Sequence, residues 1–172
     1  MTIRPEQPAD YTAIAEVVGG AFSHHPEVVA FVEAIRASPE YVPELALVSE
    51  DGSGVVAHVM LSWAGLEGGD PDRILVLTPM SVRPDRQRQG FGSALVREAL
   101  VRAERFGAPA VFLEGIPGYY PRFGFEPARE LGLVKPLRSI PEEAFMVRRL
   151  SGWTPRLAGR IVYPASYAAL GG

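Results

Sequence analysis

The sequence has no cysteine, no long apolar run and no excess of basic residues. The absence of cysteine excludes disulfide bonds and thiolate chemistry. No apolar stretch approaches the roughly 20 residues of a membrane-spanning helix, and the first residues lack the apolar core of a signal peptide. We therefore expect a cytoplasmic protein that does not enter a membrane. Lys and Arg number 17 against 20 Asp and Glu, and this balance disfavours a general nucleic-acid binder.

Apolar residues make up 47% of the 172 residues, which suits one compact domain with a full core. A strand, a helix and a second strand follow one another along residues 73–115, and such a crossover unit places its two strands in parallel. Residues 65–72 are predicted to form a polar loop, and residues 151–172 an extra strand, a lid or a dimer contact. Periodicity predicts strands at 2–4, 45–49, 55–63, 73–82, 110–115 and 144–150, and helices at about 10–22, 26–37 and 92–106.

A strand end, a polar turn with two glycines and a helix follow one another from Met80 to Leu95. Gly90 and Gly92 carry no side chain, so the backbone can come close to a ligand there. The amides of a helix's first turn have no partner within the helix, and the helix dipole is positive at that end. The turn is therefore predicted to bind a phosphate or pyrophosphate. It lacks the Gly-Lys-Ser/Thr of nucleotide triphosphatases, and Leu95 stands where the dinucleotide fingerprint needs a third glycine.

The strand before this turn contains a proline, Pro79, which cannot donate a hydrogen bond to a neighbouring strand. A proline at that position points to a bulge or to a place where strand pairing stops. Amides near it would then be left for a ligand. The pattern Gln87-x-x-Gly90-x-Gly92 in the following turn resembles the acyl-CoA-binding motif of the GNAT superfamily of N-acetyltransferases.

A second motif strengthens this resemblance. Tyr120, followed by Gly124 and Phe125, is similar to the tyrosine and Gly-Phe pair that these chains often carry. The stretch Pro-Gly-Tyr-Tyr-Pro-Arg-Phe-Gly-Phe-Glu-Pro at 117–127 resembles the branch of uncharacterised predicted N-acetyltransferases. The likeness covers about residues 74–125 well. It implies a single-domain GNAT-like α/β fold over residues 1–172, with a mixed, mostly antiparallel sheet flanked by helices.

The resemblance implies acetyl-CoA as cosubstrate and no metal. The family's pantetheine arm lies along the bulged strand like an extra strand, so the amides of Met80 and Val82 become candidate donors, with Met80 facing the oxyanion. Three arginines near the turn could supply positive charge for the CoA phosphates, or they could belong to a solvated turn without a ligand. A third interpretation, a small nucleic-acid-binding patch, ranks last. The implied cofactor-binding residues are Met80, Ser81, Val82, Gln87, Arg88, Gln89, Gly90, Phe91, Gly92 and Ser93, and the arginines are Arg83, Arg86 and Arg88.

Acetyl transfer to an amine needs a base for the amine and an acid for the departing thiolate. Tyr120 is the acid by resemblance, because a phenol is a neutral donor at pH 7; its alternative is an aromatic core residue. Glu114 lies near the end of the strand predicted at 110–115, and it is either the base or a solvated carboxylate. The family often has an asparagine at this position. His24 and His25 lie in a region that shapes the family's acceptor site, or they are surface residues. His58 is predicted to be a hydrogen-bonded sheet residue.

The predicted function is transfer of an acetyl group from acetyl-CoA to a primary amine, a small molecule rather than a protein. We expect no nucleic-acid or membrane partner, and a homodimer is an open possibility. Two alternatives stand beside this function. One is a non-catalytic acyl-CoA-binding module; the other is an acyltransferase that acts on a hydroxyl or uses a longer acyl chain.

Overall fold

The structure is a computed structural model that describes residues 1–171, except for the side chains of residues 69–72. The chain divides into two compact units. Strands β3 (Gly54–Leu66) and β4 (Gly69–Val82) and helix α3 (Phe91–Phe106) each contribute residues to both units. The first unit consists of Met1–Ser62, Thr78–Arg102 and Ala165–Gly172, and the second of Trp63–Leu77 and Ala103–Pro164.

An antiparallel hairpin of β2 (Tyr41–Asp51) and β3 forms the centre of the first unit's sheet, with Val48 opposite His58. The strand β1 (Thr2–Pro5) pairs antiparallel with β2 on its other side. β4 follows β3, so the order of hydrogen-bonded strands is β1-β2-β3-β4. The strands predicted from the sequence are confirmed, and β2 starts before the predicted strand because it also pairs Tyr41 with Ser62.

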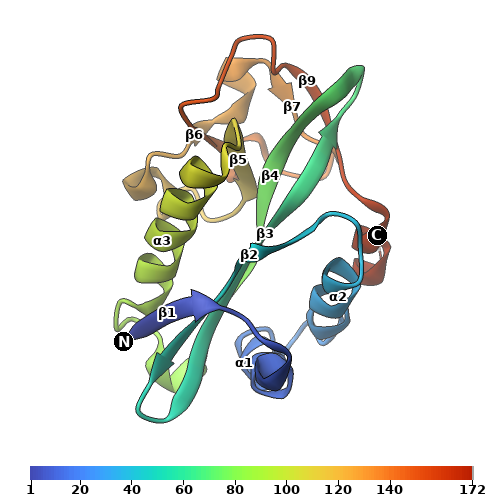
Figure 1. The fold of residues 1–172 in the computed structure, drawn as a ribbon. Coiled ribbons are helices and arrows are strands. Elements are labelled where there is room, and N and C mark those ends of the chain that lie inside the picture. Colours follow the sequence, from blue (N-terminus) through green and yellow to red (C-terminus); the bar gives the residue numbers. More distant parts are fainter. Residues whose placement is uncertain (172) are drawn as a thin grey trace. The chain divides into compact units, whose positions relative to one another are not determined.

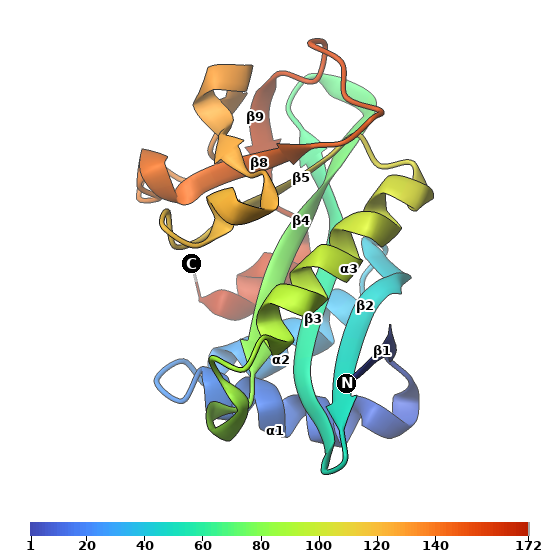
Figure 2. The ribbon, with the colours of Figure 1, turned by 90° about the vertical axis from the view of Figure 1, so that its left-hand side faces the viewer.

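Helices cover both faces of these strands (Figures 1 and 2). α1 (Tyr11–Ala21) and α2 (Glu27–Arg36) lie on one face, and the part of α3 within the first unit lies on the other. Both N-terminal helices confirm the predicted ones, and Pro26 directly precedes α2. Their apolar faces pack on β2 and β3 in one cluster of buried residues: Ile14, Val18, Val28, Phe31, Val32, Ile35, Ala46, Val48 and Met60.

A buried carboxylate joins the end of β1 to α2 and the hairpin. Glu6 is 8% exposed, and its carboxylate hydrogen-bonds to His58 Nε2 (2.9 Å), Arg36 Nε (2.8 Å) and the Tyr41 hydroxyl (2.7 Å). Burial by itself raises the pKa of Glu6, but the bonds from His58, Arg36 and Tyr41 outweigh burial and lower the pKa to about 2. His58 is therefore a hydrogen-bonded sheet residue, as predicted.

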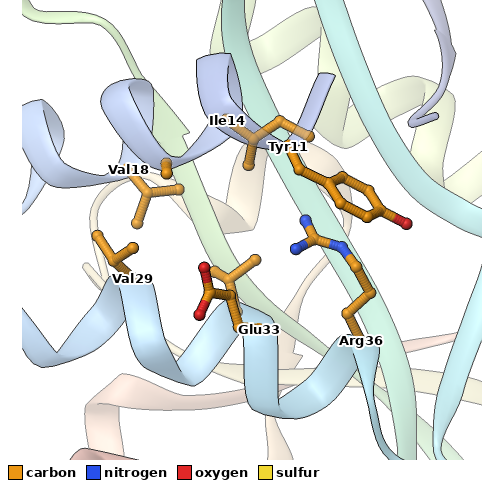
Figure 3. A pocket seen from close by; sticks show the side chains of 8 residues that line it. Tyr11, Ile14, Val18, Val29, Glu33 and Arg36 are labelled. Carbon is orange, nitrogen blue, oxygen red and sulfur yellow. The ribbon is translucent and has the colours of Figure 1, made fainter. Parts of the chain in front are cut away.

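A pocket lies between α1 and α2 (Figure 3). The guanidinium of Arg36 lies over the Tyr11 ring, 3.8 Å from its centroid. The pocket's volume is about 10 Å³, which is close to the space that one water molecule needs. A pocket of this size is too small for a substrate.

The second unit contains the parallel strand pairing that the sequence predicts. β5 (Ala110–Glu114) pairs in parallel with β4, with Leu75 opposite Val111, and antiparallel with β8 (Phe145–Arg149). β6 (Glu126–Pro127) pairs with β8, so the order in this unit is β3-β4-β5-β8-β6. α3 ends before Gly107, whose φ of +87° favours glycine and confirms the predicted helix stop.

The prediction of a polar loop over 65–72 is wrong. β3 continues to Leu66 because Gly65 and Leu66 pair with Val162 and Ile161 of β9 (Gly159–Val162), and β4 begins at Gly69. β9 also pairs in parallel with β7 (Leu133–Val134), so the C-terminal segment contains the extra strand among its three predicted forms. Short 3-10 helices complete the fold: Pro8–Asp10, Pro84–Arg86, Tyr120–Phe123, Ala128–Leu131, Glu142–Ala144 and Ala165–Leu170.

Candidate active site

The turn between β4 and α3 has the backbone of an anion site. Arg88 has φ +61° and Gly90 φ +90°, two left-handed conformations within one short turn. For a non-glycine residue such as Arg88 this costs about 1–2 kcal/mol, and strain of this kind clusters at ligand sites. Ala94 N–H donates to Gly90 O at 3.0 Å, so the first turn of α3 begins here. In general, the leading amides of a helix have no partner within the helix, and the dipole is positive at this end.

Gly92 brings the start of α3 close to the end of β4. A Cβ at Gly92 would lie 3.4 Å from Met80 Sδ and 3.4 Å from Val82 Cγ2. A larger side chain there would meet the side chains of Met80 and Val82. Gln87 strengthens the same junction, because its Nε2 donates to Val82 O at 3.1 Å. The structure therefore brings together Met80, Val82, Gln87 and Gly92, four of the predicted cofactor-binding residues.

Along β4, side chains alternate between the two faces. Met80 and Val82 share the face that meets Gly92, whereas the side chain of Ser81 is on the other face and is 2% exposed. Ser81 therefore offers a ligand its main chain only. The described ladder between β4 and β5 covers Leu75 and Val76, and Pro79 comes after it. Pairing with β5 thus stops before the predicted ligand-binding stretch, in agreement with one of the two outcomes expected from the proline.

The three arginines near the turn differ in what they contact. Arg83 donates to Asp85, with 2.5 Å between Nε and Oδ1, and Arg86 donates to Asp51 at 2.7 Å. Their charges are therefore largely matched by neighbouring carboxylates. Arg88 is exposed, and no described residue forms an ion pair or hydrogen bond with its side chain. Arg88 is the arginine that remains for a phosphate.

Tyr120 is held in an aromatic cluster in the second unit. Its ring centroid lies 5.0 Å from that of Tyr119 and 5.8 Å from that of Phe125, both edge to face. Gly124, with φ +85°, ends the 3-10 helix that Tyr120 begins, and this turn directs Phe125 back toward Tyr120. Burial raises the pKa of Tyr120 to about 12. The hydroxyl has no hydrogen-bond partner among the described residues, so it is open to a ligand.

Gly115 is a contact of Tyr120 that the sequence did not single out. A Cβ at Gly115 would lie 2.5 Å from Tyr120 Cε2 and 2.9 Å from Cδ2. The ring therefore occupies the space where any other residue would have its side chain. The sequence gives no local signal for this contact, because Gly115 and Tyr120 are joined by a loop whose course depends on tertiary packing.

Glu114, the candidate base, is exposed at the end of β5. Its Oε2 accepts a hydrogen bond from the Tyr163 hydroxyl at 3.1 Å. The Tyr163 ring stacks on Phe112, with 6.2 Å between centroids. Burial and the Glu114 carboxylate both raise the pKa of Tyr163, so its hydroxyl remains a donor. Tyr163 is thus a second contact missed from the sequence, supplied by the C-terminal segment.

The predicted acceptor-site histidines lie exposed between α1 and α2. His25 Nδ1 lies 3.3 Å from Glu27 Oε1, and His24 has no comparable contact among the described residues. Their role stays a prediction. Among the side chains that the structure describes, which leave out residues 69–72, no cluster of three or more His, Cys, Asp or Glu could hold a metal ion. No helix of the described chain has the length and apolarity to cross a membrane.

The predicted site residues fall into two sets. The cofactor-binding stretches Met80–Val82 and 87–93, together with His24 and His25, belong to the first unit. Glu114 and Tyr120 belong to the second. The first set forms a strand-to-turn-to-helix junction suited to a phosphorylated ligand, and the second places a phenol and a carboxylate on either side of Gly115 in the chain.

Comparison with known proteins gives the family. The acetyltransferase (GNAT) domain model matches residues 2–128, so the chain belongs to the GNAT family of acetyltransferases. The uncharacterized N-acetyltransferase YjhQ of Escherichia coli K12 is 31% identical over 158 residues, which are 89% of this chain and 86% of YjhQ. The uncharacterized N-acetyltransferase YhbS of the same strain is 32% identical over 152 residues, 88% of each chain.

Solved structures give the same answer for the fold. The crystal structure of YhbS from Escherichia coli in complex with CoA has a TM-score of 0.87 at 28% identity, covering 97% of this chain and 91% of YhbS. A GNAT family acetyltransferase from Brucella melitensis in complex with acetyl-CoA has a TM-score of 0.79 at 29% identity, covering 96% and 97%. The predictions of a GNAT-type N-acetyltransferase and of a mixed, mostly antiparallel α/β fold are confirmed.

Proposed function

We propose that the chain binds acetyl-CoA at the junction of β4 and α3 and transfers the acetyl group to a primary amine of a small molecule. The observation that carries the proposal is the turn itself, with two left-handed residues, Arg88 and Gly90, directly before the first turn of α3. CoA and acetyl-CoA in the two solved relatives support it.

The CoA phosphates would lie against the amides of Phe91 and Gly92, where dipole and unshared N–H groups favour an anion. Arg88 would add a charge-assisted bond to a phosphate oxygen. The pantetheine arm would lie along Met80 to Val82, beyond the end of the described pairing with β5. The other predicted contacts, Gln87, Gln89 and Gly90, are exposed in the same turn, and Ser93 is half-buried in the first turn of α3.

In the reaction, the amine nitrogen forms a bond to the thioester carbon and the carbon–sulfur bond breaks. Negative charge develops on the carbonyl oxygen, where the Met80 amide would stabilise it. The leaving sulfur takes its proton from Tyr120, whose raised pKa keeps the phenol protonated at neutral pH. A lysine-like amine has a pKa of about 10.4, so its proton must leave for Glu114 or water. The products are an amide and CoA.

The test replaces Gly90 with glutamate. A carboxylate in this turn repels phosphate, and the left-handed φ of Gly90 strains any other residue, so the control must have the same backbone strain. The matched control is Gly107→Glu, at the other end of α3, with φ +87° and, like Gly90, no atom within 4 Å of an added Cβ. Titration calorimetry with acetyl-CoA should show binding by the wild type and the control and none by Gly90→Glu.

Release of free thiol from acetyl-CoA in the presence of an amine panel separates the enzyme from a non-catalytic acyl-CoA-binding module. The module would bind acetyl-CoA and release no CoA with any amine. Equal acetyl-CoA affinity of wild type and Gly90→Glu would remove the cofactor site from this turn.

A further inference from the structure

An open pocket of about 330 Å³ lies at the end of β5 in the second unit. This volume is at the lower end of the range for small-molecule sites. The walls come from Glu114 and Gly115 and from the segment before and at the start of β8. Two of the lining side chains are polar, the Glu114 carboxylate and the Ser139 hydroxyl. The others are apolar: Leu137, Ile140, Pro141 and Ala144.

The carboxylate of Glu114 has no cationic partner. No lysine or arginine among residues 1–171 forms an ion pair with it, and its hydrogen bond comes from the neutral Tyr163 hydroxyl. Lys135, near the pocket in sequence, is used otherwise, because its Nζ donates to Ile140 O and lies 3.3 Å from Glu142 Oε1. A carboxylate at the edge of a pocket and without a cation fits a ligand that brings one.

The remaining wall suits a hydrocarbon. Leu137 is 50% exposed although it is large and apolar, and Ile140 beside it is 5% exposed. A ligand lying on Leu137 would remove that apolar surface from water, which is favourable by about 25 cal/mol per Å². A second charge on the ligand would be unfavourable there, because it would lose water without finding a partner.

The pocket adjoins the residue proposed as the acid. Gly115 lines the pocket, and the Tyr120 ring lies within 2.5 Å of the position that a Gly115 Cβ would take. Gly115 is therefore a neighbour of both the pocket and the Tyr120 ring, within one compact unit, although Tyr120 does not line the pocket. A molecule in the pocket meets Glu114 directly.

We propose that this pocket holds the acceptor, and that the acceptor is a primary monoamine with a short apolar body. Its ammonium contacts the Glu114 carboxylate, and its hydrocarbon lies on Leu137, Ile140 and Ala144. Diamines and polyamines are poor acceptors, because the second ammonium meets the apolar wall. This inference rests on the proposed function and adds the substrate class to it.

The experiment uses straight-chain alkylamines of increasing length and measures release of CoA. Each methylene that the pocket buries should raise kcat/KM about fourfold, from about 0.8 kcal/mol per buried CH₂, until the pocket is full. A terminal diamine of the same length should be at least about tenfold poorer than the monoamine. Leu137→Ala should flatten the length dependence. The matched control is Val134→Ala, an exposed apolar residue of the same unit (43%) that does not line the pocket.

A direct binding measurement keeps the inference separate from catalysis. Hexylamine should shift the backbone amide resonances of residues 114–115 and 137–144 in the full-length protein, and Glu114→Gln should weaken this binding by up to about fivefold, the contribution of an exposed ion pair. Shifts elsewhere, or none, would overturn the pocket assignment whether or not the protein is an enzyme. The pocket assignment would also be overturned if the rate of CoA release did not depend on amine chain length in the wild type and did not change in Leu137→Ala. Amine binding in the pocket without CoA release would instead count against the proposed function.

Discussion

Replacing Gly115 with alanine should slow acetyl transfer by moving Tyr120. The added Cβ would lie 2.5 Å from Tyr120 Cε2 and 2.9 Å from Cδ2, and it would meet Leu113 Cδ1 at 3.2 Å. Carbon atoms in contact prefer about 3.5–4.0 Å, so the ring must shift by about 1 Å. A displacement of this size at a reacting group can reduce the rate about 10²-fold.

The same substitution should have a modest effect on stability. Overpacking costs about 1–3 kcal/mol, and the lower backbone entropy of alanine in the unfolded chain offsets about 0.4–1 kcal/mol of this. Gly115 does not have a left-handed φ, so alanine is compatible with its backbone. A matched control is Gly118→Ala in the same loop, where an added Cβ has no atom within 4 Å.

The assay is steady-state release of CoA, with thermal unfolding of each variant as a check on folding. Gly115→Ala should lower kcat by up to about 10²-fold and leave the KM for acetyl-CoA near the wild-type value, whereas Gly118→Ala should match the wild type. The decisive comparison is a double-mutant cycle with Tyr120→Phe. Because Gly115 acts through the position of the phenol, Gly115→Ala should lose little further activity once the hydroxyl is absent.

Two results would refute this reasoning. Gly115→Ala could retain the wild-type kcat, in which case the ring moves without consequence or the phenol takes no part in the reaction. Alternatively, Gly115→Ala could reduce kcat by the same factor in the Tyr120→Phe protein as in the wild type. Additivity of that kind would mean that Gly115 acts on the reaction by a route other than Tyr120.

Further predictions concern proton transfer, stability and metals. Since burial raises the pKa of Tyr120 to about 12, kcat should show no loss from phenol ionisation up to about pH 10.5, whereas a break near pH 10 would indicate an ordinary tyrosine. Glu6→Ala should lower the free energy of unfolding by about 3–5 kcal/mol, measured in urea, because it leaves Arg36 without its carboxylate; a loss below 1 kcal/mol would contradict this. With a folded pKa of about 2, the Glu6 contribution is present above the unfolded pKa of about 4.3 and is lost as pH falls toward 2. EDTA should leave CoA release unchanged, and a loss that Zn²⁺ restores would reveal a metal requirement. Replacing His24 and His25 together with alanine tests the acceptor region expected from the sequence: a raised KM for the amine would place the histidines in the acceptor site, and an unchanged amine KM would favour the pocket at Glu114.

The sequence by itself determined much of the fold and the cofactor motif, because those signals are local. Apolar periodicity located α1, α2 and α3 and the long strands, and the crossover order predicted the parallel pairing of β4 and β5. The glycine turn could be interpreted from neighbouring residues, since the first turn of a helix and the freedom of Gly90 are properties of a few consecutive residues. The prediction of a loop at 65–72 was wrong because Gly65 and Leu66 of β3 pair with β9, a strand distant in sequence.

Only the tertiary structure decided which arginine is free, what touches Tyr120 and where a pocket opens. Arg83, Arg86 and Arg88 look alike in the sequence, and the carboxylates of Asp51 and Asp85 distinguish them. The contact of Gly115 with the Tyr120 ring, and the bond from Tyr163 to Glu114, join residues through packing that no local pattern encodes. Side-chain contacts of this kind depend on where separate segments of the chain meet, and that is fixed by the core as a whole.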